Sequence, residues 1–148
     1  MFPRERDKIS GQILSICLLA FASASVAYPA TLTVSPNGTY QSIQTAITAA
    51  QPGDVIEVRA GVYNENLLID KQLNLIGFDR PIIHGGGSGS VIVISSDSCV
   101  VRGFRVEHSG SELQTEDSGI LLKSSNNRVE QNELRDVLYG IYFYRANG

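Results

Sequence analysis

Short runs of apolar or alternating residues, separated by Gly, Asp, Asn and Ser, fill most of the chain after residue 54. Examples are residues 55–58 (VIEV), 73–76 (LNLI) and 91–94 (VIVI). Runs of this kind, bounded by turn-forming residues, predict short β-strands. Many short strands in succession indicate a β-sandwich, a β-barrel or a solenoid.

A repeated sequence template decides between these architectures. Residues 119–126 (GILLKSSN) reappear as residues 140–147 (GIYFYRAN), a shift of 21 residues that keeps the apolar positions. The same template slides back by 28 residues, which places Ile92 on Ile120 and Val101 on Val129, with the extra residues in the polar stretch 108–118. A coil of this length cannot bury its apolar face alone and must stack on its neighbours. We therefore predict an all-β fold, a right-handed parallel β-helix over residues 55–148.

The template also assigns positions within each coil. Three glycines, Gly103, Gly119 and Gly140, are predicted at corners, where a Cβ would crowd the backbone. The residues predicted to point inward are Ile92, Ile94, Val101, Val106, Ile120, Leu122, Val129, Leu134, Ile141 and Phe143.

A different pattern precedes the strands. Ile43, Ala46, Ile47 and Ala50 recur at helical spacing, which predicts an amphipathic helix over residues 40–50, ended by the Pro-Gly pair at 52–53. Residues 28–54 are thus expected to form a cap that covers the open end of the first coil. At the other end, Gly148 falls partway through a coil, so we expect the coils to continue in a longer protein.

The first 27 residues have the pattern of a cleaved export signal. Basic residues up to Lys8 precede an apolar run over 13–22, and small residues lead to an expected cleavage before Tyr28. An uncleaved membrane anchor is the alternative, although the apolar run is shorter than the ~20 residues that span a bilayer. Attachment of lipid at Cys17 is disfavoured by the branched Ile16. The mature chain is therefore expected outside the cytoplasmic membrane.

Charge and cysteine content narrow the function of the mature chain. Removing the signal's three basic and two acidic residues from the totals of 12 and 15 leaves 9 and 13, a net charge of −4. This balance argues against nucleic-acid binding. Cys99 is the single cysteine that remains, so no internal disulfide is possible, and we expect it to act as a small buried apolar residue.

Two stretches resemble known families. Residues 40–77 (YQSIQTAITAAQPGDVIEVRAGVYNENLLIDKQLNLIG) resemble the opening of the pectin-lyase-like β-helix superfamily, which includes esterases, lyases and proteins without enzymatic activity. Residues 100–148 are similar to the NosD family of nitrous oxide reductase maturation proteins. That similarity rests on Gly103-Phe104, on His108-Ser109-Gly110 before an acidic loop, on DSGI at 117–120 and on VLYGIY at 137–142.

The NosD resemblance implies a periplasmic accessory protein without enzymatic activity. It implies work with an ABC transporter and a copper chaperone in assembling the copper centres of nitrous oxide reductase, without a stable homo-oligomer. Family members are longer than this chain. The transporter-docking region of the family can therefore lie outside the present sequence.

Copper(I) prefers thiolate, thioether and imidazole ligands, and the mature chain offers only Cys99, His84 and His108. Both histidines follow strands of successive predicted coils, so they are expected on neighbouring rungs of the helix. We take His84 and His108 as the candidate copper ligands. The alternative is that both are partly exposed turn residues.

Other polar groups are interpreted as structural. The acidic residues Glu107, Glu112, Glu116 and Asp117 match no compact calcium loop, so a solvated acidic turn is favoured over a cation site. Amide side chains recur at turn positions, where they bond to the backbone or stack between coils. These are Asn126, Asn127, Asn132 and Asn147.

An enzymatic alternative remains open. Residues 61–65 (GVYNE) match the G-x-Y-x-E pattern of pectin methylesterases. The other groups that an esterase, lyase or glycosidase needs cannot be placed in this sequence. A carbohydrate-active β-helix enzyme or sugar-binding module (pectin esterase/lyase-like) is therefore the second hypothesis.

Overall fold

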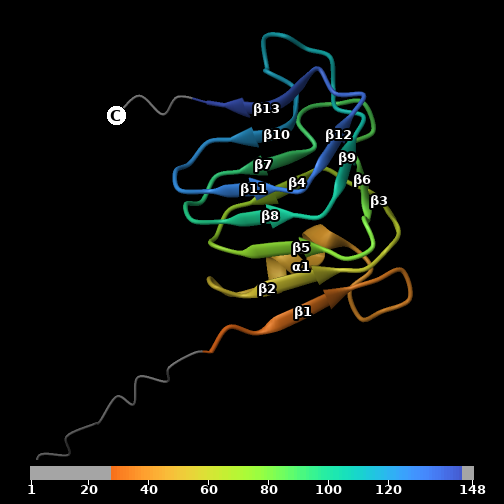
Figure 1. Cartoon of the computed structure of the whole chain (residues 1–148), viewed down its shortest axis with the longest axis vertical. Coiled ribbons are helices and arrows are strands. Elements are labelled where there is room, and N and C mark those ends of the chain that lie inside the picture. The colour runs from red at the N-terminus through yellow and green to blue at the C-terminus, as the bar shows by residue number, and fades with distance from the viewer. Residues whose placement is uncertain (1–27, 145–148) are drawn as a thin grey trace, which may run out of the picture.

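Three parallel β-sheets run side by side along the molecule, and one short helix lies near its N-terminal end (Figure 1). The computed structural model describes residues 28–144. Sheet A has the order β1 (Thr31–Val34), β2 (Val55–Val58), β5 (Asn74–Gly77), β8 (Val100–Arg102) and β11 (Arg128–Glu130). Sheet B has the order β3 (Val62–Asn64), β6 (Ile82–His84), β9 (Arg105–Glu107) and β12 (Glu133–Arg135). Sheet C has the order β4 (Leu67–Ile69), β7 (Ile92–Ile94), β10 (Ser118–Leu122) and β13 (Tyr139–Phe143).

The chain visits the three sheets in turn, so each circuit stacks one strand on the strand of the previous circuit. This is the predicted parallel β-helix. The predicted register is confirmed, because Ile92 pairs with Ile120 and Val101 pairs with Val129. Ile120 pairs with Ile141 across the 21-residue shift. The longer 28-residue circuit contains the connection from β9 to β10, where the enlarged turn was expected.

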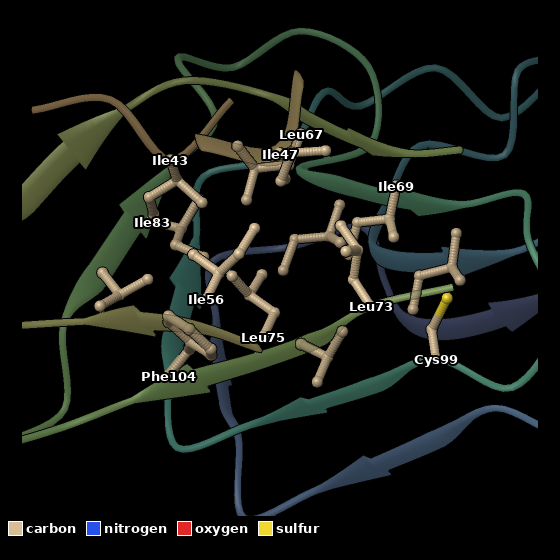
Figure 2. Packing of buried hydrophobic residues seen from close by; sticks show 14 of the residues in the cluster. Ile43, Ile47, Ile56, Leu67, Ile69, Leu73, Leu75, Ile83, Cys99 and Phe104 are labelled. Atoms are coloured by element: carbon tan, nitrogen blue, oxygen red, sulfur yellow. The ribbon is translucent and has the colours of Figure 1, made fainter. Parts of the chain in front are cut away.

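The core is a continuous column of aliphatic side chains inside the three sheets (Figure 2). The inward residues predicted on β7 to β10 are buried, and Val129 and Leu134 are partly buried against the same column. Ile141 and Phe143 share the register of buried Ile120 and Leu122 but are 41% and 73% exposed. Within residues 28–144, β13 pairs only with β10, which leaves their outer side uncovered.

The glycine prediction is correct at one position and wrong at two. Gly103 follows β8 with φ of +85°, and a Cβ there would collide with the carbonyl oxygen of Gly77 on the coil below. Gly119 and Gly140 lie within β10 and β13, not at corners. A Cβ on Gly119 would stand 3.0 Å from the carbonyl oxygen of Gly140 and 3.1 Å from Leu134 Cδ2, so close packing between coils explains this glycine.

The helix is present but shorter than predicted. Helix α1 spans Ile43–Ala49, and Ser42 caps it by accepting a hydrogen bond from the Thr45 backbone N–H at 3.1 Å. Tyr40 cannot belong to the helix because it forms a β-bridge with Val34. As predicted, the apolar face of α1 is buried, and the helix contacts β1, β2 and β4 at the N-terminal end of the coils.

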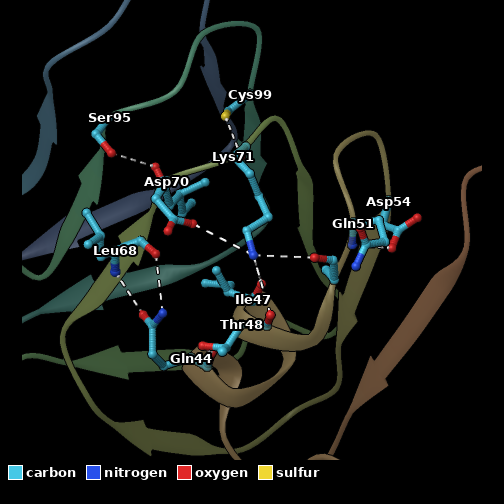
Figure 3. A network of polar contacts seen from close by, with 12 residues as sticks. Gln44, Ile47, Thr48, Gln51, Asp54, Leu68, Asp70, Lys71, Ser95 and Cys99 are labelled. Carbon is cyan, nitrogen blue, oxygen red and sulfur yellow. Dashed lines mark hydrogen bonds and ion pairs between the residues drawn. The ribbon is translucent and has the colours of Figure 1, made fainter.

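Polar side chains from the first coil hold both ends of α1. The Glu65 carboxylate accepts hydrogen bonds from Ile43 N at 2.8 Å, Gln44 N at 3.0 Å and Ser42 Oγ at 2.9 Å. At the other end, Lys71 Nζ donates to the carbonyl oxygen of Ile47 at 3.2 Å (Figure 3). A carboxylate at the N-terminus and an ammonium group at the C-terminus both complement the helix dipole.

Asparagine side chains join successive coils. Asn127 Oδ1 accepts a hydrogen bond from Cys99 N at 2.9 Å, and Asn132 Oδ1 accepts one from Phe104 N at 3.1 Å. Asn126 has φ of +59°, a turn conformation that asparagine tolerates well. The structural interpretation of these three amides is confirmed, whereas Asn147 lies outside the described residues.

No helix within residues 28–144 has the length and apolar character needed to cross a membrane. The predicted export signal, residues 1–27, lies outside the described part of the chain.

Candidate functional site

His84 and His108 lie together at the corner that follows sheet B. His84 ends β6, and its register partner on β9 is Glu107, so His108 is one residue farther along the next coil. The two imidazole rings stack with their centroids 4.8 Å apart and their planes 21° apart. The expectation that these histidines occupy neighbouring rungs is confirmed.

Asp136 completes the corner from the third coil. Its Oδ2 lies 2.7 Å from Nδ1 of His108, and both residues have positive φ, 64° for His108 and 48° for Asp136. A carboxylate accepts a proton from an imidazole N–H, so Nδ1 carries a proton and Nε2 of neutral His108 keeps its lone pair. This carboxylate–histidine arrangement is the one that orients metal-binding histidines. The sequence analysis missed Asp136, although the 28-residue template places it on His108.

His84 is held in the opposite tautomer. Its Nδ1 accepts a hydrogen bond from the backbone N–H of Gly86 at 3.2 Å. An accepting Nδ1 is unprotonated, so the proton of neutral His84 is on Nε2. His84 can therefore act as a ligand only after it exchanges this proton or gives up the bond to Gly86.

The stacked geometry limits how the pair can hold an ion. Nitrogen lone pairs lie in the ring planes, so an ion between two stacked faces would meet neither lone pair. Coordination therefore has to occur at the ring edges. Within residues 28–144, no group of three or more His, Cys, Asp or Glu side chains is arranged to hold a metal ion.

Cys99, the third candidate for a soft ligand, belongs to the core. Its side chain is 1% exposed, and its Sγ lies 3.2 Å from the carbonyl oxygen of Ser96 and 3.4 Å from that of Lys71. Burial raises the pKa of the Cys99 thiol above its ordinary value, which disfavours the thiolate that a metal ion would need. The expectation that Cys99 behaves as a small apolar residue is confirmed.

A small hollow of about 250 Å³ adjoins His84. Asn64, Glu65, Asn66 and Gly86 are among its lining residues. Asn66 is fixed because its Nδ2 donates to the carbonyl oxygens of Ser88 and Ser90, both at 2.9 Å. The hollow leaves room beside the imidazole of His84 for a small ligand or for a side chain of another protein.

The acidic loop is organised around a buried carboxylate. Asp117 is 3% exposed, and it accepts hydrogen bonds from Glu112 N at 3.1 Å and from Thr115 Oγ1 at 2.8 Å. Glu116 points elsewhere and accepts a hydrogen bond from the Tyr142 hydroxyl at 3.0 Å. Asp117 thus serves as a bond acceptor that shapes the loop, while Glu112 is exposed.

The G-x-Y-x-E stretch has a structural role in this chain. Tyr63 is 4% exposed, and its hydroxyl donates to the carbonyl oxygen of Arg59 at 2.9 Å. Burial, followed by the nearby charge of Glu65, raises the Tyr63 pKa. Glu65 caps helix α1, so both of the distinctive side chains are engaged in holding the first coil together.

Comparison with known proteins agrees with this architecture. No family model matches the chain. A search of curated proteins finds similarity to a protein of Pseudomonas aeruginosa strain PAO1 described as probable ABC transporter binding protein NosD, with 28% identity over 109 residues. The match covers 66% of this chain and 26% of the relative, so the chain matches about a quarter of the relative's length. In sequence and in fold, this chain resembles a NosD-like β-helix over the part that the two share.

Proposed function

We propose that the chain is an exported accessory protein that assists assembly of the copper centres of nitrous oxide reductase. The similarity to NosD, together with the parallel β-helix, is the observation that supports this role. Stacked coils give a rigid surface whose corners can present side chains at fixed spacing, a property that suits a protein working through contacts with partners.

Copper is the proposed cargo, and the corner of His84 and His108 is its proposed contact. Imidazole nitrogen is a suitable copper ligand. Asp136 holds His108 in the tautomer whose Nε2 is available, so His108 is the primary ligand. His84 would join after its bond to Gly86 is broken, and this requirement favours transient transfer over tight storage.

The proposed partners are an ABC transporter and a copper chaperone. The printed description of the P. aeruginosa relative names an ABC transporter, which supports the first partner. The basic and apolar pattern of residues 1–27 supports export, and the proposed location is the periplasm. Copper would then pass between proteins on the outer side of the cytoplasmic membrane.

The carbohydrate-active alternative receives no support from the G-x-Y-x-E stretch. Glu65 and Tyr63 each have intramolecular partners in the first coil. We therefore do not advance a second function on that motif.

Disruption of the gene in its source organism tests the proposal. Nitrous oxide reductase purified from the disrupted strain should contain less copper per subunit than the wild-type enzyme. The intact gene should restore the copper content, and a His84→Gln/His108→Gln gene should restore less. Full copper content in the disrupted strain would refute the accessory role. Full restoration by the double variant would refute only the role of the histidine corner.

A further inference from the structure

Two adjoining hollows cross the outer face of sheet A and the corner that leads to sheet B. The smaller, of about 270 Å³, is lined by Asn74, Ile76, Val100, Arg102, Arg128 and Glu130. The larger, of about 950 Å³, is lined by residues that directly follow these strands, including Gly77, Gly103 and Gln131. Because β5, β8 and β11 are hydrogen-bonded neighbours (Figure 1), the two hollows form one open channel, which we call the arginine trough.

Basic residues are concentrated around this trough. Eight Lys and Arg residues occur between residues 28 and 144. Five of them line the trough or bond to Glu133 in its wall: Arg80, Arg102, Arg105, Arg128 and Arg135. Only three of the thirteen acidic residues in the same range line it, namely Asp79, Glu130 and Glu133. The trough is thus a basic region on a chain that carries excess negative charge elsewhere.

The arginines are oriented but not all used. Glu133 bonds to Arg80 at 3.3 Å, to Arg105 at 3.3 Å and also to Arg135, so one carboxylate holds three guanidinium groups in place. Each guanidinium has five N–H donors, so most of these donors stay available. Within residues 28–144, Arg102 forms no ion pair with any side chain. Arg102 is the clearest free anion-binding group of the trough.

The shape and chemistry of the trough select the ligand. Guanidinium groups recognise carboxylates through paired hydrogen bonds. The floor at Ile76 and Val100 offers apolar contact, and the open form of the trough fits an extended chain. None of the lining residues is aromatic, so a sugar ring would find no aromatic face to pack against.

We propose that the arginine trough binds an acidic peptide segment of a partner protein. The Asp and Glu side chains of the segment engage Arg102 and Arg128 while its backbone lies along the floor of the trough. This inference is independent of the copper role of the histidine corner, because it uses different residues on a different sheet.

Fluorescence anisotropy with the purified chain tests the proposal. The probe is a labelled ten-residue peptide of Asp and Glu, and the reference probe is the same length of Asn and Gln. The acidic peptide should bind, and Arg102→Gln and Arg128→Gln should each weaken binding about fivefold, as expected for loss of a charge-assisted contact. Lys123→Gln, which removes one positive charge from sheet C, should leave binding within about twofold.

Three results would overturn the proposal. Absence of binding at low salt would do so, as would equal weakening by Arg102→Gln and Lys123→Gln, which would indicate attraction to net charge alone. The third is displacement of the peptide by trigalacturonate or by inorganic phosphate at lower concentration than by unlabelled peptide. That outcome would assign the trough to a sugar acid or to a phosphate group instead.

Discussion

The side-chain amide of Gln44 hydrogen-bonds to both backbone groups of Leu68. Gln44 Oε1 accepts from Leu68 N at 2.8 Å, and Gln44 Nε2 donates to the Leu68 carbonyl oxygen at 3.3 Å (Figure 3). Strand β4 is the edge of sheet C, and this pair of bonds is what a further strand would supply there. Helix α1 therefore protects a sheet edge with one side chain as well as covering the apolar end of the coils.

Replacing Gln44 by Ala should lower the free energy of unfolding by about 1 kcal/mol, because two hydrogen bonds of a partly exposed edge are lost. Alanine favours helix more than glutamine does, so helix propensity cannot cause the loss. Urea unfolding followed by circular dichroism measures the effect. Gln51→Ala is the matched control, since the Gln51 side chain is exposed and outside the helix. Equal effects of the two substitutions would contradict the proposed role of Gln44.

The close approach of two corners predicts a second stability effect. Gly103→Ala should destabilise the chain by about 1–3 kcal/mol more than Gly86→Ala. Both glycines have positive φ, +85° and +68°, so both variants bear a backbone cost. Only at Gly103 would the new Cβ meet backbone atoms of Gly77, whereas nothing lies within 4 Å at Gly86. Thermal unfolding of the two variants provides the comparison, and equal melting temperatures would disagree with the packing of these coils.

Glu133 should respond to pH. Hydrogen bonds from Arg135, joined by those from Arg105, hold the pKa of Glu133 below its ordinary value of 4.5. A carboxyl group with a lowered pKa in the folded state stabilises that state above the ordinary pKa. That contribution is lost as the pH falls through the lowered value. Carbon-13 NMR titration of the Glu133 carboxyl should therefore give a midpoint below 4.5.

The variant Arg135→Gln serves as the control for this titration. It removes the first of the donors, so the midpoint of Glu133 should move up towards 4.5. A midpoint at or above 4.5 in the unsubstituted chain would show that the arginine contacts do not persist in solution.

The register of the later coils could be predicted because their circuits are equal in length. From β8 to β11 and from β9 to β12 the paired residues are 28 positions apart, so one template aligns both strands. Earlier circuits vary: Leu67 pairs with Ile92 and Asn74 pairs with Val100, at separations of 25 and 26. Corners of unequal length conceal the repeat there, and the pattern alone gave strands without their partners.

The candidate site could be predicted only in part. Residue type and strand position were enough to bring His84 and His108 together. Asp136 was missed because its role depends on a left-handed turn conformation that aims its carboxylate back at the previous coil. Glu65 was considered only as part of an enzyme motif, since no local pattern shows that it bonds to a helix more than twenty residues earlier.

Copper(I) binding by the purified chain tests the account most directly. In competition with a copper(I) chelator under reducing conditions, a Cys99→Ala chain should retain copper(I), and His108→Gln should abolish this retention. Asp136→Asn should weaken affinity about tenfold or more, because the carboxylate only orients His108. Retention that is equal in the parent and in a His84→Gln/His108→Gln variant, or no retention in either, would contradict the assignment of this corner to copper.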